Sequence, residues 1–498
     1  MEVAGRHPIC VACYYVAMAH GGGGLAHHWR RWTSLEGWVS YVGGWGVSRA
    51  LFLGVLFAGY FTLLSYFIPN LSLFTFGWLV GTAPIWLPVA LVVGAWRMWV
   101  TYTQSLYLSQ RKTMLLELRF PREITKSPRA MELALANLSL GSGETTFIHR
   151  AWKGQVRPHF SLELVSFGGQ VHFYIWTWSV YKDLIESSFY AQYPDVEIIE
   201  VEDYASAFQF DPNTHTAWGM EWRLSTYMHG FAESGLKDFR INAYQPRSYV
   251  DYELDKDPKE EFKIDPLAYV LEYMSNIRQD EQLWVQIIMR KAGKQGVLGI
   301  LKRPDFESMW KETVEEEVQR LRAQAAIIPS SVLEEVYREA GDEGNTARPP
   351  QPRPSWRQQR MMESMERHLA KTPFEVGVRG IYWTRGDLRG PIYAGLRALW
   401  RPYGNPNYGS QLAPLGWHND FDYPWQDVHG IRWTQQVRRV FDAYRRRSYF
   451  APPWRMPANI LTNETLASLW HPPSRSITAP GVARTPATKA EAPVNLPV

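Results

Sequence analysis

One short stretch of the chain gathers side chains that can bind a metal ion: His418, Asp420, Asp422, Asp427 and His429. Imidazole and carboxylate groups are common metal ligands. The residues between them favour a different structure, a loop packed by its own rings: Phe421, Tyr423, Pro424 and Trp425. One polar cluster without a nucleophile and a base is weak evidence for catalysis. We therefore predict no metal, no cofactor and no enzyme activity for this chain.

A basic segment, Thr434–Arg447, is the second candidate site. Guanidinium groups next to aromatic rings can bind a phosphate backbone or an acidic protein surface. The simpler interpretation is a solvated helix face with local ion pairs to Asp427 and Asp442. The residues predicted to contact DNA or a protein partner are Arg438, Arg439, Arg445, Arg446 and Arg447.

Other motifs with known chemistry are missing from the sequence. Gly293–Gly299 lacks the Lys-Ser/Thr pair of a phosphate-binding loop, and neither a G-x-S-x-G nor an H-E-x-x-H pattern occurs. Cys10 and Cys13 are the two cysteines, spaced as C-x-x-C near His7 and His20. Without a second pair or a βαβ context, we assign them no role. The low cysteine content fits a reducing compartment.

Two apolar segments come before the charged part of the chain. Leu51–Ile68 carries no charge, and Trp78–Val100 is a second apolar span interrupted by Pro84 and Pro88. Crossing a bilayer takes about 20 helical residues. Pro69–Gly77, the expected loop between them, has no basic residue, and the basic residues lie outside the two spans: Arg30, Arg31, Arg49, Arg111, Lys112, Arg119 and Arg122.

This charge distribution predicts a two-pass protein of the inner (cytoplasmic) membrane with both termini and the bulk of the chain in the cytoplasm. The alternative is a pair of buried helices in a globular core. Residues 1–48 are predicted to be a disordered leader, although Ile9–Ala19 is similar to a short signal segment. The hairpin is predicted to occupy residues 49–100.

The body begins with a recognisable order of elements. Strand, helix, hairpin, helix and strand are predicted in turn at Thr113–Pro121, Ser127–Leu140, Phe160–Ser166 with Val171–Thr177, Ser179–Gln192 and Val196–Val201. The order β-α-β-β-α-β is that of a ferredoxin-like (split βαβ) unit. We assign residues 101–232 to this first module.

A second, less regular set of elements is predicted over residues 233–401. Strand, helix, strand, strand and helix are predicted in turn at Leu236–Ala243, Asp265–Ile277, Gln282–Arg290, Phe374–Thr384 and Gly390–Trp400. A charged helical and Pro-rich insertion occupies residues 303–358, either as a solvated helix or as a coiled-coil contact between subunits. Residues 402–472 form an aromatic and basic segment with a short helix at Thr462–Leu469, and residues 473–498 form a disordered tail. The predicted fold class is α+β, a two-helix transmembrane hairpin followed by tandem ferredoxin-like modules.

Several sequence segments resemble those of one protein family: Leu116–Leu133, Ser161–Trp176, Ile185–Tyr204, Lys263–Leu271, Tyr423–Asp427, Phe441–Phe450 and Ile460–Pro472. The chain is similar to the N-terminal, non-ATPase region of bacterial membrane-anchored type IV secretion and conjugation ATPases of the coupling-protein kind. In that family the segment resembling Glu491–Pro497 leads into a motor domain. Here the chain stops, so we expect no ATP hydrolysis.

The resemblance implies a membrane-anchoring scaffold subunit of a type IV secretion- or conjugation-like translocase of DNA or protein. Its expected partners are the lipid bilayer, a separately encoded secretion-type ATPase, DNA and further copies of itself. The segment predicted to dock the ATPase contains Glu464, Leu466, Leu469, Trp470 and His471. The alternative is a purely structural component of a membrane or envelope complex that never contacts nucleic acid, which the net charge of +4 favours.

Overall fold

The computed structural model describes residues 49–121, 124, 126–141, 146–226, 242–256, 264–297, 301–325, 354–405, 410–416, 425, 427–473, 481–482 and 484–485. The chain divides into two compact units. The first contains residues 1–93, 229–234 and 420–433, and the second contains residues 94–228, 235–419 and 434–498.

The apolar segments form three helices, α4 (Arg49–Phe67), α5 (Pro69–Gly81) and α6 (Ala83–Ser109). Among the described residues, α6 alone is long and apolar enough to cross a membrane, and the apolar part of α4 is the shorter Phe52–Phe67. The two-span hairpin is therefore not confirmed. The loop predicted at Pro69–Gly77 is wrong, because Pro69 lies in the first turn of α5, where its missing N–H costs no hydrogen bond. Pro88 lies inside α6 without ending the helix.

The last turns of α6 pack against a short π-helix, η1 (Ile148–Trp152). Trp96 stacks on Phe147 with ring centroids 5.7 Å apart, and Trp99 meets Trp152 at 5.5 Å. The Thr103 hydroxyl donates to the Ala151 carbonyl at 3.2 Å. The apolar helix therefore continues directly into the folded body.

Gly154 makes a testable contribution to this packing. Its φ is +62°, and a Cβ there would lie 2.1 Å from the Thr103 carbonyl oxygen. Gly154→Ala is expected to lower the free energy of unfolding by on the order of 3 kcal/mol, through the left-handed backbone and the clash. Urea unfolding in detergent measures it. Gly141→Ala is the control, since its Cβ would meet only Lys291 side-chain atoms at 3.6 Å. Equal unfolding midpoints for the two variants would contradict the expected contact.

The first half of the body follows the predicted order. It contains β1 (Thr113–Pro121), α7 (Pro128–Ala136), β2 (Phe160–Phe167), β3 (Gln170–Trp178), α8 (Lys182–Tyr190) and β4 (Glu197–Val201). Its strands run in the spatial order β4-β1-β3-β2, with every neighbouring pair antiparallel. Gly168 and Gly169 both have positive φ and form the predicted β2–β3 turn.

The second half repeats this order. It contains β5 (Thr216–Thr226), α10 (Leu267–Ser275), β6 (Glu281–Lys291), β9 (Pro373–Thr384), α14 (Gly390–Ala398) and β10 (Ser410–Gly416). Its strands lie as β10-β5-β9-β6, again all antiparallel. The first strand was predicted at Leu236–Ala243, which lies mostly outside the described residues, and β5 was not predicted.

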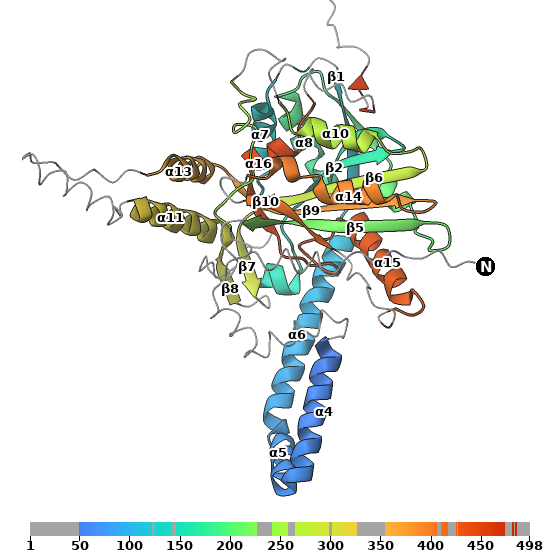
Figure 1. The fold of residues 1–498 in the computed structure, drawn as a ribbon, viewed down its shortest axis with the longest axis vertical. Helices are drawn as coiled ribbons and strands as arrows, with labels where there is room; N and C mark the ends of the chain where they lie inside the picture. Colours follow the sequence, from blue (N-terminus) through green and yellow to red (C-terminus); the bar gives the residue numbers. More distant parts are fainter. Residues whose placement is uncertain are drawn as a thin grey trace, which may run out of the picture. The chain divides into compact units, whose positions relative to one another are not determined.

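Strands β2 and β6 pair antiparallel and join the two halves into one ten-stranded sheet (Figure 1). The sheet includes β11 (Asn459–Thr462), which pairs with β9, and β12 (Arg484–Thr485), which pairs with β1. The predicted α+β class is confirmed by this large antiparallel sheet with its helices.

Further elements connect or extend the two halves. Between β6 and β9 lie β7 (Lys294–Val297), β8 (Leu301–Asp305), α11 (Phe306–Ala325) and α13 (Trp356–Leu369). The remaining short elements are η2 (Ser179–Tyr181), α9 (Tyr204–Ala207) and η4 (Arg401–Tyr403). α11 and α13 share an apolar cluster that includes Trp310, Val314, Met361 and Met365.

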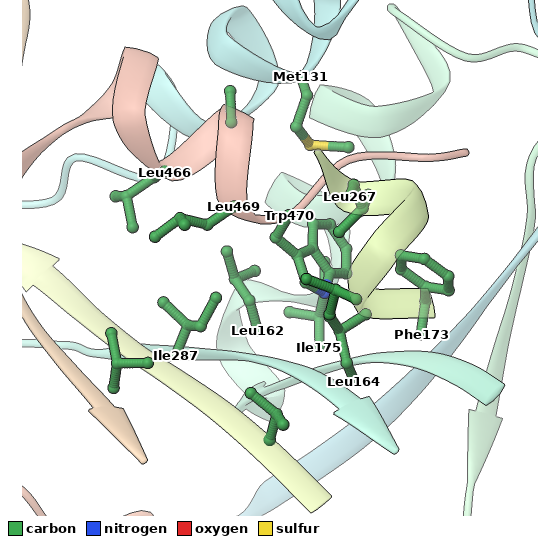
Figure 2. Close-up of a cluster of buried hydrophobic side chains, with 14 of the residues drawn as sticks. Met131, Leu162, Leu164, Phe173, Ile175, Leu267, Ile287, Leu466, Leu469 and Trp470 are labelled. Atoms are coloured by element: carbon green, nitrogen blue, oxygen red, sulfur yellow. The ribbon is translucent and has the colours of Figure 1, made fainter. Parts of the chain in front are cut away.

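One face of the sheet forms the main core. Because strand side chains alternate between faces, Leu162, Leu164 and Ile287 point to the same side. Figure 2 shows Leu466, Leu469 and Trp470 lying over them. These three come from the C-terminal helix α16 (Asn463–Leu469) and the residue after it. The C-terminal segment therefore completes the core.

Candidate functional site: the basic face of helix α15

Helix α15 (Ile431–Arg445) lies on the other face of the sheet. Phe441 meets Phe208 with ring centroids 5.0 Å apart, and Tyr444 meets Trp284 at 5.5 Å. Trp284 belongs to the opposite face of β6 from Ile287, so α15 covers the side that α16 does not. This packing fixes which side of α15 faces solvent.

The exposed side of α15 is cationic. Arg438, Arg439, Arg445 and Arg446 are all exposed, and we call these four residues the basic face. Seven-residue spacing places Arg438 above Arg445 and Arg439 above Arg446 on one side of the helix. The structure thus brings four of the five predicted arginines to one surface.

Two of these arginines, Arg445 and Arg446, have an acidic partner on the same helix. Asp442 accepts hydrogen bonds from Arg445 Nη2 and Arg446 Nε, each at 2.9 Å. Burial raises the pKa of Asp442, but the bonds from Arg446 and Arg445 outweigh it and lower that pKa overall. In the part of the chain that the structure describes, Arg438 and Arg439 form no ion pair.

The start of α15 is fixed by Asp427. Its carboxylate oxygens accept from the backbone N–H groups of Arg432 at 3.1 Å and Trp433 at 2.7 Å. Burial raises the pKa of Asp427, and these backbone bonds outweigh it and lower the pKa. His429 is exposed, while His418, Asp420 and Asp422 lie outside the described residues. Within the described residues, no group of three or more side chains could hold a metal ion.

Arg447 was predicted to contact a partner, and this prediction is wrong. Its side chain is fully buried, with Nε 2.9 Å from Glu163 Oε1 and Nη2 2.9 Å from Asp203 Oδ1. A guanidinium group with two carboxylate partners inside the protein has no free face for DNA. Arg447 instead holds the end of α15 to the sheet.

The prediction that the ATPase docks on the C-terminal segment is also wrong, because the residues named for it are not on the surface. Its five residues are buried: Glu464, Leu466, Leu469, Trp470 and His471. Glu464 accepts from Ser248 Oγ at 2.6 Å and from Arg367 Nε at 3.0 Å. His471 Nε2 lies 2.9 Å from Asp265 Oδ2. A partner cannot reach these side chains, because they complete the core.

Sequence reasoning missed a buried polar group on the face of the sheet that α15 also covers. Glu375 pairs with Arg157 at 2.9 Å and with Arg290 at 2.7 Å. Burial raises the pKa of Glu375, and Arg290 and Arg157 outweigh it and lower the pKa. Burial, aided by Arg290 and Arg379, lowers the pKa of His159 to about 3, so this imidazole is neutral. These side chains are enclosed, which fits a structural role.

The chain was compared with known proteins in three ways. No protein-family model matches it, and neither a curated protein nor a solved structure does so.

Proposed function

We propose that this chain is a membrane-anchoring scaffold subunit of a type IV secretion- or conjugation-like translocase. The proposal includes a secretion-type ATPase as the partner that would hydrolyse ATP; a G-x-x-x-x-G-K-[ST] loop does not occur within these 498 residues. The resemblance of seven sequence segments to the non-motor region of coupling-type ATPases supports this proposal.

The observation that carries the proposal is the continuity of α6. One uninterrupted helix includes the apolar stretch and the residues that pack on η1. Trp96, Trp99 and Thr103 contact Phe147, Trp152 and Ala151 of the body, so the C-terminal half of this helix is part of the body. An anchor built this way suits a scaffold that must hold an assembly at the membrane.

We assign α4 to a second span. Its 19 residues extend about 28 Å at 1.5 Å per residue, close to the hydrocarbon thickness. In this arrangement the chain is a two-pass inner-membrane protein with its bulk in the cytoplasm, because the basic residues flank the apolar helices on that side.

We assign each half of the sheet to a ferredoxin-like module. The matching strand orders β4-β1-β3-β2 and β10-β5-β9-β6 support this assignment. Such α+β units offer sheet edges and helix surfaces for subunit packing. We propose that further copies of the chain and the ATPase bind these surfaces.

Membrane extraction tests the anchor. The full-length protein is expected to stay in the membrane pellet at alkaline pH. Leu91→Arg combined with Val92→Arg should raise the released fraction, because each charge at mid-bilayer costs roughly 3 kcal/mol. Leu106→Arg, in the exposed part of α6 beside the body, is the matched control. Release of the unaltered protein would contradict the anchor.

The purely structural alternative gains support from the burial of Arg447. Titration of DNA into the reconstituted protein at several salt concentrations distinguishes a DNA-translocase scaffold from a purely structural component. Binding that weakens steeply with salt reports phosphate contacts and favours a DNA translocase. No binding at low salt favours protein transport or the structural alternative.

A further inference from the structure

The chemistry of α6 changes along its length. From Ala83 to Ala95 the helix carries no charged or hydroxyl side chain, and from Trp96 to Ser109 it mixes aromatic, basic and hydroxyl side chains. Trp and Tyr gather at the boundary between hydrocarbon and headgroups, where their rings leave water and their polar atoms stay hydrated. Trp96 and Tyr102 are separated by a rise of about 9 Å, comparable with one headgroup layer of roughly 5–8 Å.

The short π-helix η1 is held against this part of α6. Trp96 stacks on Phe147 and Trp99 meets Trp152, and all four residues belong to one compact unit. Directly after η1, the backbone of Gly154 lies so close to that of Thr103 that no Cβ fits between them. Because the two backbones are in contact, η1 lies at the same depth as the aromatic part of α6.

The exposed side of this packed pair is apolar. Ile148 and Trp152, one turn apart in η1, are 57% and 55% exposed, while Met98 and Tyr102, one turn apart in α6, are 74% and 60% exposed. Trp99 joins them, with ring centroids 5.5 Å from Trp152 and 6.3 Å from Tyr102. We call these five residues the collar. Exposed apolar side chains gathered in this way mark a surface that meets a protein or a membrane.

Basic residues border the collar. Arg97 follows Trp96 and Lys153 follows Trp152, and both basic side chains are exposed. Residues 94–109 and 146–153 contain no Asp or Glu. Long basic side chains can lay their carbon atoms along an apolar surface and bind lipid phosphates with their charged ends.

We propose that the collar lies in the headgroup layer of an anionic bilayer. Ile148 and Trp152 enter the boundary with the acyl chains, and Arg97 and Lys153 bind lipid phosphates. This inference rests on the membrane attachment proposed above and adds a second contact to it. The folded body then touches the membrane surface through η1, in addition to being joined to the anchor helix.

The chemistry of the collar favours lipid over other partners. A nucleic acid backbone would satisfy Arg97 and Lys153, but it gives no gain for Ile148 or Met98, whose carbon atoms are stabilised only by leaving water. A protein surface could cover the same carbon atoms. Lipid headgroups, however, already surround a helix at the end of its membrane span, so the bilayer supplies both the phosphate and the apolar partner at this depth.

Site-specific quenching tests the contact in the full-length protein. In a Cys10→Ser, Cys13→Ser background, an environment-sensitive dye is attached to Ile148→Cys, Leu91→Cys or Leu133→Cys. The protein is reconstituted in nanodiscs of phosphatidylglycerol mixed with phosphatidylcholine that carries a nitroxide on its headgroup or deep in its acyl chain. Leu91 lies in the apolar part of α6, and Leu133 is an exposed residue of α7 outside the collar.

The expected result is loss of fluorescence at Ile148 with the headgroup nitroxide, at Leu91 with the acyl-chain nitroxide, and at Leu133 with neither. Met98→Cys, on the α6 side of the collar, should behave as Ile148→Cys does. Quenching at Leu91 alone, with aqueous iodide reaching the dye at Ile148 and Met98, would overturn the inference, leave the anchor intact and assign the collar to a protein partner. Quenching at none of the positions would overturn the anchor and the inference with it.

The basic residues are tested by moving the nitroxide to phosphatidylglycerol. Quenching at Ile148 should be stronger with labelled phosphatidylglycerol than with the same amount of labelled phosphatidylcholine. Arg97→Gln with Lys153→Gln should reduce this preference by up to about fivefold for each residue, the factor by which a cation is attracted to an anionic leaflet. Arg129→Gln, at an exposed position of α7, is the matched control. Equal quenching by the two lipids in the parent protein would overturn the proposed phosphate contacts.

Discussion

Trp470→Ala is expected to lower the free energy of unfolding by about 4 kcal/mol, the range for a large aromatic removed from a core. Trp470 is fully buried, with its ring centroid 5.7 Å from that of Phe173 and 6.2 Å from that of Phe189. Its indole N–H donates to the Glu163 carbonyl at 3.4 Å. Truncation leaves a cavity between the C-terminal segment and the sheet (Figure 2).

Denaturant unfolding of the detergent-solubilised protein measures this change. Trp356→Ala is the matched control, because Trp356 is 68% exposed and its loss should change stability by less than about 0.5 kcal/mol. If Trp470→Ala unfolded at the same denaturant concentration as the parent protein, Trp470 could not be a core residue.

Arg447→Met is expected to lower the free energy of unfolding by about 3–5 kcal/mol, since removing the guanidinium group leaves its carboxylate partners uncompensated. Glu163 is fully buried, the side chain of Asp203 is 23% exposed, and both accept hydrogen bonds from this guanidinium group. Adding Glu163→Gln should recover part of the loss, because the second substitution removes one of the uncompensated charges. Arg446→Met, at an exposed neighbouring position, should change stability little.

The ion pair between Arg447 and Asp203 predicts that the stability of the fold depends on pH. Burial raises the pKa of Asp203, and Arg447 more than offsets this and lowers it. A carboxyl group with a lowered pKa stabilises the fold fully above its unfolded pKa of about 3.9. That contribution is lost as the pH falls through the lower folded pKa. Urea midpoints measured from pH 6 to the acid range should therefore converge for the parent protein and Arg447→Met as Asp203 becomes protonated. A constant difference would contradict the assigned pair.

The sequence predicted the elements whose patterns are local. Gly168-Gly169 between two alternating runs indicated the β2–β3 hairpin, and both glycines do take positive φ. The strand β5 was missed although Trp218, Met220, Trp222 and Leu224 alternate with small or polar residues. Its alternating pattern is present in the sequence, whereas the run predicted as the first strand of this half, Leu236–Ala243, lies mostly outside the described residues.

The errors at the candidate site come from contacts between residues far apart in the chain. Arg445, Arg446 and Arg447 are alike in sequence, and only the distant Glu163 and Asp203 distinguish the buried one. Glu464 looks solvent-exposed in a short amphipathic helix, yet Arg367 and Ser248 neutralise and bind it in the core. Local composition cannot identify such partners, because the tertiary fold brings them together from distant helices, loops and strands.

Purification of the full-length protein from its native membranes tests the scaffold proposal most directly. The chain is extracted in mild detergent, cross-linked, and its partners are identified by mass spectrometry. The account predicts a membrane-extracted complex that contains a protein with a G-x-x-x-x-G-K-[ST] loop, cross-linked to the body of this chain. Recovery of this chain only with copies of itself, or from the soluble fraction, would contradict it.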